Sequence, residues 1–198
     1  MPLLMLKDLP RYECILDVAR LHPELDPSAC EAYLNVLRAG DEAYSRSAVF
    51  LNEHAMSMGR FTVMMLLYDK IGGKPVPQTP ADLAEKAGVA RATITGLVDT
   101  LERDGLVTRE HDSGDRRMML VHLTAKGHLA LREILPGYFK QIAAQMAPLS
   151  ESERKTLVRL LSKTAGRASA ARVEVHPAAA EGAAQAAVET ENPFTSSK

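Results

Sequence analysis

The chain lacks the residue patterns of the common enzyme and metal sites. It has only two cysteines, Cys14 and Cys30, whose separation fits no zinc-binding spacing. The motifs His-Glu-x-x-His and Gly-x-Ser-x-Gly are absent, as is a glycine-rich phosphate loop, and the histidines are scattered singly along the sequence. We therefore expect no catalytic residue, no metal and no cofactor, and the protein is not expected to be an enzyme.

The sequence also lacks an apolar run long enough to cross a bilayer, and its first residues lack the basic region and cleavage site of a secretory signal. Its 198 residues are 46% hydrophobic and 25% charged, which is typical of a globular protein. We expect one domain with appendages, no membrane partner and a cytoplasmic location in which the two cysteines stay reduced.

An excess of positive charge, the usual sign of a nucleic-acid-binding protein, is missing as well. The net charge is -1, and acidic residues balance the basic ones even in the central segment described next. This argues against tight non-specific binding to DNA. It leaves open a winged helix that binds only proteins, and it argues less against a dimer whose cations gather on one face.

Residues 79–105 have the pattern of a helix-turn-helix. Thr79 can cap a first helix with Pro80 at its first position, Gly88 suits a left-handed turn, and Gly105 ends the second helix. The second helix has one apolar face, formed by Val89, Ile94, Leu97, Val98 and Leu101. The residues of the opposite face are short or can form hydrogen bonds, so this face can enter a major groove. They are Arg91, Ala92, Thr93, Thr95 and Gly96.

A two-stranded ribbon is predicted directly after this helix. Residues 106–111 and 118–123 alternate as strands do, and residues 112–117 have the composition of a hairpin turn, with Arg116 and Arg117 near its tip. A thin cationic ribbon fits a narrow minor groove. The fold class we predict is mainly α: a winged helix-turn-helix with a two-stranded β-wing and with helices before and after it.

Four motifs in this order resemble the MarR family of bacterial transcriptional regulators. They are Asp-Leu-Ala-Glu at 82–85, Gly-Leu-Val at 105–107 followed by Arg109, Asp-Arg-Arg at 115–117, and Leu-Thr-Ala-Lys-Gly at 123–127. The resemblance covers roughly residues 29–165. It implies a homodimeric repressor that binds a pseudo-palindromic operator in double-stranded DNA and is released by a small molecule or an oxidant.

The resemblance also implies roles for single residues. Arg117 matches the wing arginine that enters the minor groove, Asp115 matches the acid that fixes the wing tip, and Arg109 matches the arginine on the preceding strand. For Arg116, contact with DNA and exposure to solvent remain equal alternatives. Ala90 stands where the family usually has Ser or Asp, and the loss of such a cap costs about 0.5–2 kcal/mol.

The rest of the chain divides into helical segments around the winged helix. We expect an N-terminal extension with a short helix over 11–21, a long helix from Asp26, and an apolar helix over 58–71. After the ribbon we expect a helix from Thr124 to about Met146, kinked by Pro136, and a last helix that begins at Ser150 and turns Leu157, Leu160 and Leu161 inward. The predicted boundaries are 1–25 (extension), 26–72 (dimerisation and effector crevice), 73–127 (DNA binding), 128–168 (dimerisation) and 169–198 (flexible tail).

By the same resemblance, a small aromatic or phenolic acid is expected to bind between the helical and winged-helix parts. Arg60 and His54 are the best candidates, because an aromatic carboxylate needs a cation. The candidate effector-binding residues are Tyr44, His54, Arg60, Phe61 and Met64. For the methionine and the aromatic residues, plain core packing is the alternative.

An oxidant sensor based on a thiol is the other hypothesis within the family. A reactive thiol needs a lowered pKa, and no Lys or His lies one helical turn from Cys30. Cys14 has only Arg11, three residues earlier, as a nearby cation. Packing is therefore the default role for both cysteines.

Overall fold

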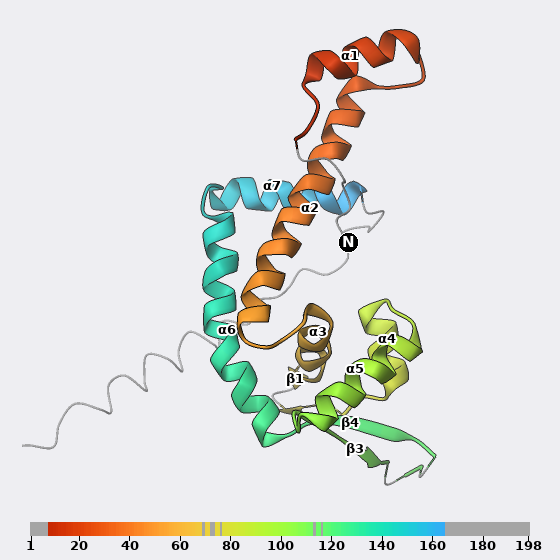
Figure 1. The fold of residues 1–198 in the computed structure, drawn as a ribbon, viewed down its shortest axis with the longest axis vertical. Helices are drawn as coiled ribbons and strands as arrows, with labels where there is room; N and C mark the ends of the chain where they lie inside the picture. Colours follow the sequence, from red (N-terminus) through yellow and green to blue (C-terminus); the bar gives the residue numbers. More distant parts are fainter. Residues whose placement is uncertain are drawn as a thin grey trace, which may run out of the picture. The chain divides into compact units, whose positions relative to one another are not determined.

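The computed structural model describes residues 8–68, 70–71, 74–75, 77–112, 114–115 and 117–164. It divides into two compact units, residues 1–147 and 148–198. The helices of the first unit are α1 (Tyr12–Leu21), α2 (Pro27–Glu53), α3 (Met58–Tyr68), α4 (Pro80–Ala87), α5 (Arg91–Arg103) and α6 (Ala125–Met146). Its strands are β1 (Lys70–Ile71), β2 (Lys74–Pro75), β3 (Val107–His111) and β4 (Met119–Leu123). The predicted fold class, mainly helical with a two-stranded wing, is confirmed (Figure 1).

The helices begin where the capping residues predict. The Asp26 side chain accepts hydrogen bonds from the backbone N–H groups of Ser28 and Ala29 at the start of α2. Thr79 and Asp82 form a reciprocal capping box at the start of α4, and Thr124 Oγ1 accepts from the N–H of Gly127 at the start of α6. These side chains satisfy N–H groups that have no partner inside their helices.

The long helix α2 keeps much of its apolar stripe exposed in the single chain. α1 packs along the first part of α2 (Figure 1), with Ile15 buried. Further along α2, Tyr33 is 63% and Tyr44 is 57% exposed. Leu51, at the end of the same stripe, is fully buried. The contrast means that the core of this unit covers only the last turns of α2.

The core is centred on α3, which is apolar on nearly all sides and buries Phe61, Val63, Met64 and Leu67. The prediction that this helix runs to Ile71 is wrong. It ends at Tyr68, and Lys70–Ile71 pairs antiparallel with Lys74–Pro75. The two glycines between these short strands in the sequence disfavour helix and favour a reversal of the chain.

α4 and α5 form the predicted helix-turn-helix. Gly88 has φ 65°, the left-handed conformation that the turn requires. Ile94, Val98 and Leu101 are completely buried, and Leu97 packs against Gly59 of α3. Val89, predicted to lie on the buried face, is instead 43% exposed because it belongs to the turn and not to the helix.

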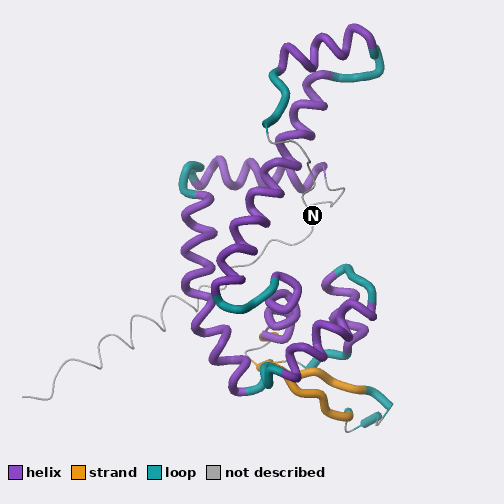
Figure 2. The backbone as a smooth tube through the Cα atoms, viewed as in Figure 1, coloured by secondary structure: helices purple, strands orange, loops and turns teal. Residues whose placement is uncertain are grey.

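β3 and β4 form the wing, a thin antiparallel ribbon that runs below α5 and away from α6 in the view of Figures 1 and 2. Each strand begins one residue later than predicted. Gln78, just before α4, adds a bridge on the other side of β4 through two backbone hydrogen bonds with Val121. Its side chain is buried and donates to the carbonyl oxygen of Leu66. The wing is thereby joined to the core at its base.

α6 continues through Pro136 as one helix, and its axis bends part-way along its length (Figure 1). None of the helices in the described part of the chain combines the length and apolarity that a membrane crossing requires.

The second unit contains α7 (Glu151–Thr164). It begins with the predicted capping box, in which the N–H of Ser150 donates to Glu153 Oε2 at 2.7 Å. Leu157, Leu160 and Leu161, which are predicted to face inward, are exposed in the single chain. The predicted flexible tail over 169–198 lies outside the described residues.

Candidate nucleic-acid interface

The predicted recognition face lies on the solvent side of α5. Its side chains are all exposed, whereas Ile94 and Val98 on the opposite side are completely buried. The exposed set is Arg91, Ala92, Thr93, Thr95 and Gly96. The core therefore holds α5 by one face and leaves the other free for a partner.

The N-terminal end of α5 has no side-chain cap. Ala90 is the N-cap residue and makes no capping hydrogen bond through its side chain, as predicted. The first N–H groups of the helix can therefore donate to an external anion such as a phosphate. One turn later, the hydroxyl of Thr95 donates to the carbonyl oxygen of Arg91 at 3.0 Å. The hydroxyl of Thr95 is thus available to a partner as an acceptor.

Two aspartates organise the tip of the wing. Asp112 Oδ1 accepts hydrogen bonds from the N–H groups of Gly114 (2.6 Å) and Asp115 (3.0 Å). Asp115 Oδ1 accepts from the N–H of Arg117 at 2.9 Å, and the Arg117 side chain is exposed. Asp112 belongs to the predicted hairpin turn, where Asp-Ser-Gly is a common turn signal, but it is not among the predicted site residues. Arg116 lies outside the described residues.

Arg109 is partly buried, whereas the other predicted DNA-binding residues that the structure describes are exposed. Its Nη1 lies 2.7 Å from Glu102 Oε2, its Nη2 pairs with Asp99, and its side chain is 21% exposed. Partial burial alone would lower the pKa of Arg109, but the hydrogen bond to Asp99 and the charges of Glu102 and Asp99 outweigh it and raise the pKa. Arg109 therefore joins the wing to α5 through Asp99 and Glu102, which are not among the predicted site residues.

Known proteins with similar sequences show which family the chain belongs to. A model of the MarR family matches residues 56–119. The chain is 34% identical over 156 residues to the HTH-type transcriptional repressor YetL of Bacillus subtilis (strain 168). The matched region covers 79% of this chain and 92% of YetL. The chain belongs to the MarR family. It is a DNA-binding transcriptional regulator and not an enzyme.

Two solved structures of bacterial DNA-binding proteins share the fold. Sco3205 of Streptomyces coelicolor, a MarR family regulator solved in complex with DNA, matches 71% of this chain and 91% of its own with a TM-score of 0.64 and 21% identity. BpsR of Bordetella bronchiseptica, whose DNA binding is regulated by 6-hydroxynicotinic acid, matches 66% of this chain and 89% of its own with a TM-score of 0.57 and 24% identity. At these identities the likeness concerns the fold.

The predicted effector residues of this MarR-family chain do not converge on one pocket. His54 and Arg60 line a hollow of about 490 Å³ together with Asp104, Lys126 and Glu133. The guanidinium of Arg60 is already paired with the carboxylate of Asp104, and His54 Nδ1 lies 2.9 Å from the carbonyl oxygen of Phe50. Nζ of Lys126 donates to the backbone carbonyl oxygen of Asp104 at 2.7 Å, so Arg60 and Lys126 both already have partners within the protein.

Phe61 lines a different hollow, of about 580 Å³. This hollow is mostly apolar and carries three hydroxyl groups; its lining is Met58, Phe61, Thr62, Met65, Leu66, Tyr68 and Tyr138. Met64 belongs to the core and is completely buried, as the packing alternative anticipated. Tyr44 is 57% exposed on α2 and lines neither hollow.

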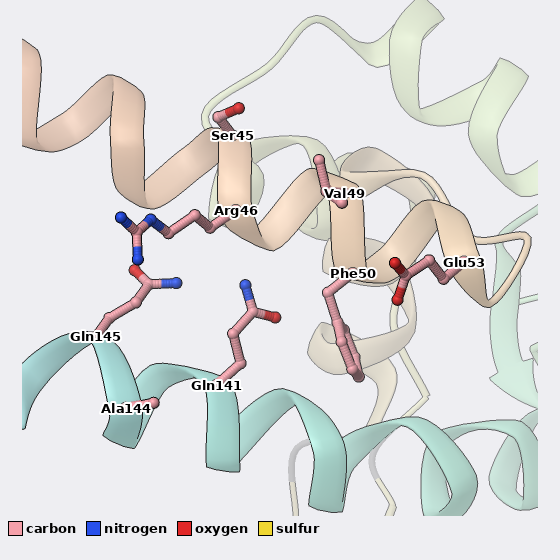
Figure 3. A pocket seen from close by; sticks show the side chains of 8 residues that line it. All are labelled: Ser45, Arg46, Val49, Phe50, Glu53, Gln141, Ala144 and Gln145. Atoms are coloured by element: carbon pink, nitrogen blue, oxygen red, sulfur yellow. The ribbon is translucent and has the colours of Figure 1, made fainter.

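A third hollow, of about 440 Å³, lies between α2 and α6. Figure 3 shows Arg46, Gln141 and Gln145 directed into the space between the two helices, with the ring of Phe50 at one end. Gln141 Oε1 and Gln145 Nε2 are buried and have no hydrogen-bond partner among the described residues. None of these residues is a predicted site residue, because polar side chains on separate helices give no sequence signal that they meet in space.

The cysteines lie apart from these hollows. Cys14 on α1 is exposed and Cys30 on α2 is partly buried; both are free thiols. Among the described residues, no group of three histidine, cysteine or acidic side chains could hold a metal ion.

Proposed function

We propose that the protein is a cytoplasmic homodimeric repressor that binds a pseudo-palindromic operator and is released by a small aromatic or phenolic acid. The observation that carries the DNA-binding part is the exposed face of α5 beside an uncapped helix N-terminus. The side chains of this face do not pack against the core and are mostly short, so the helix can closely approach the bases in a major groove about 12 Å wide.

Within this proposal the two arginines have different tasks. Arg91 at the N-terminal end of α5 reaches a guanine edge with its guanidinium, while the open N–H groups beside it bind a phosphate. Thr93, Thr95, Ala92 and Gly96 line the rest of the contact. Arg117 at the wing tip inserts into the adjacent minor groove, and Asp115 keeps it oriented through the hydrogen bond to its backbone.

The dimer is supported by apolar side chains that the single chain leaves uncovered. Tyr44 and Val49 of α2 are 57% and 58% exposed, and Phe139 of α6 is 55% exposed. Apolar residues gathered on neighbouring helices are typical of an interface. We assign residues 26–72 and 128–168 to dimerisation and 73–127 to DNA binding, so that two α5 helices read two half-sites.

The effector class is supported by the hollow that Phe61 lines. It offers an apolar lining with the hydroxyl groups of Tyr68, Tyr138 and Thr62, which suits the ring and a phenolic hydroxyl group of such an effector, while the residues that line it include no cation for a carboxylate. The DNA binding of BpsR, which shares the fold, is regulated by an aromatic acid, 6-hydroxynicotinic acid. Because α3 packs on α5, a ligand wedged against α3 would displace the recognition helix.

The test uses a duplex selected from a random-sequence pool by the unaltered protein, together with a scrambled duplex. Arg91→Ala is expected to weaken the selected duplex by about 1–3 kcal/mol and the scrambled one much less, because a base contact is lost. Arg117→Ala is expected to weaken both and to lower the salt slope by about one unit per lost phosphate contact.

Binding isotherms at several salt concentrations distinguish the two effects. If neither variant changed affinity for either duplex, the recognition face and the wing tip would not be the DNA-binding elements. For the effector, 6-hydroxynicotinate and 4-hydroxybenzoate are the probes. Failure of both to release the selected duplex at millimolar concentration would contradict an aromatic acid as effector.

A further inference from the structure

The C-terminal end of the recognition helix is held by two other helices through one residue, Asp104. Asp104 is the C-cap of α5, and its carboxylate pairs with the guanidinium of Arg60 on α3. Its backbone carbonyl oxygen accepts a hydrogen bond of 2.7 Å from Nζ of Lys126 on α6. The side chains of Arg60 and Asp104 are 18% and 41% exposed, so the pair is partly shielded from water.

An acidic residue is unfavourable for α5 itself at this position. The C-terminal end of a helix is the negative end of its dipole, where basic side chains are preferred. Arg103 is a second cation near the carboxylate of Asp104, but its Nε lies 3.9 Å from Oδ1 and its side chain is 76% exposed. A pair that exposed contributes little. A residue that conflicts with its own helix points to a tertiary role, and here the tertiary contact is with Arg60.

Arg60 extends the connection to the end of α2. Its Nη1 lies 3.5 Å from the carbonyl oxygen of Ala55. Ala55 has φ 52°, a left-handed conformation that residues with a Cβ atom avoid unless their surroundings impose it. One guanidinium thus bridges the turn after α2 and the C-cap residue of the recognition helix. Its Nε is buried without a hydrogen-bond partner among the described residues, so the two Nη atoms make the recorded contacts.

The length of α5 makes its C-terminal attachment important for DNA contact. The helix has 13 residues, which places its first and last residues about 18 Å apart. A rotation of about 3° around the C-terminal end would move the N-terminal end by about 1 Å, more than the 0.5 Å range of good N–H···O distances. Base contacts at Arg91 would be lost before contacts with the more widely spread phosphate charge.

We propose that Arg60 and Asp104 are positioning residues that set the orientation in which α5 presents Arg91 to DNA, with Lys126 holding the backbone at the same point. This proposal rests on the DNA-contacting face proposed above. Neither Arg60 nor Asp104 would touch DNA. Their contribution would therefore appear in discrimination between sequences and not in the salt dependence of binding.

The experiment is a double-mutant cycle with Arg60→Gln and Asp104→Asn in the full chain, read by binding to the selected and scrambled duplexes. Each single variant is expected to weaken the selected duplex about tenfold and the scrambled duplex less than about twofold. The double variant should bind no more weakly than either single variant, because both remove the same pair. The salt slope should stay unchanged.

Two further variants separate positioning from general loss of stability. Arg103→Gln, which removes the exposed neighbouring cation, should leave affinity for both duplexes unchanged. The exchanged pair Arg60→Asp with Asp104→Arg should restore affinity for the selected duplex to within about threefold. Circular dichroism at the assay temperature confirms that each variant is folded. A folded exchanged variant that binds as weakly as the single variants would overturn the proposal.

Other results would also contradict the positioning role or the contact face on which it rests. Multiplicative losses in the double variant would show that the two residues act separately. A salt slope lowered by one unit in Arg60→Gln would show direct phosphate contact. If Arg91→Ala weakened the selected duplex while Asp104→Asn did not, only the positioning role would fail. If Arg91→Ala had no effect, the proposed contact face itself would fail.

Discussion

A Cβ atom on Gly127 would lie 2.1 Å from the carbonyl oxygen of Leu106. Gly127 is in the first turn of α6, and Leu106 directly precedes the first strand of the wing. The carbonyl oxygen of Leu106 also accepts a hydrogen bond of 3.1 Å from the N–H of Thr124, and that of Gly105 accepts one of 2.7 Å from the Thr124 hydroxyl. The motif Leu-Thr-Ala-Lys-Gly thus holds the base of the wing by backbone contact.

Replacing Gly127 by alanine should be severely destabilising. The atom that blocks the new methyl group is a backbone oxygen, which cannot rotate away as a flexible side chain could. We expect Gly127→Ala to lower the free energy of unfolding by about 3 kcal/mol or more. Urea denaturation monitored by circular dichroism measures this. A loss below 1 kcal/mol would mean that α6 and the wing base separate at little cost.

Gly96 provides the opposite case on α5. A Cβ atom at this position would meet nothing within 4 Å, and alanine is favoured over glycine in a helix by about 0.5–1 kcal/mol. Gly96→Ala should therefore stabilise the fold by about that amount in the same denaturation assay. Because Gly96 lies on the proposed recognition face, the variant should also bind the selected duplex more weakly. Unchanged affinity would remove Gly96 from the contact surface.

Local signals explain why much of the fold could be predicted from sequence. Capping residues act within three positions of a helix start, so Asp26, Thr79 and Thr124 identified their helices correctly. The apolar period of α5 and the left-handed glycine before it are equally local. The predicted end of α3 was wrong because the true end depends on pairing between two strands of two residues each. Strands that short cannot show an alternating pattern in the sequence.

The less predictable features depend on which elements meet in space. Arg109 reads as an exposed strand residue, but its partners lie seven and ten positions earlier and reach it only because the chain reverses at Gly105, which has φ 71°. Arg60 and Phe61 are adjacent in sequence yet line different hollows. Helical spacing alone does not tell which hollow each side chain faces, since side chains 100° apart on a helix meet different neighbours.

Arg109 should therefore stabilise the attachment of the wing to α5 and should not contact a DNA phosphate. Arg109→Gln removes the ion pairs to Asp99 and Glu102, which are 56% and 38% exposed at the side chain. After allowance for solvent screening, we expect a loss of about 1 kcal/mol in the free energy of unfolding. The salt slope of DNA binding should be unchanged, in contrast to Arg117→Ala. A slope lowered by about one unit would instead restore Arg109 as a direct phosphate contact.

The last prediction concerns stability in acid and the capping box of α4. The hydrogen bond from the Thr79 hydroxyl, followed by that from the Thr79 N–H, holds the pKa of Asp82 below its ordinary value. Because the folded state has the lower pKa, Asp82 contributes stability that is fully present above the unfolded pKa of about 3.9. That contribution is lost as the pH falls through the folded pKa.

Asp82→Asn should therefore flatten the decrease in stability below about pH 4, since the variant has no proton to take up at this site. Thr79→Val, which keeps the shape of the side chain and removes the hydroxyl, should flatten it by a similar amount. The double variant should show no further change, because the two side chains form one capping box. Urea denaturation at a series of pH values from 2 to 6 tests this. Parallel acid profiles for Asp82→Asn and the unaltered protein would show that the start of α4 does not contribute to acid stability.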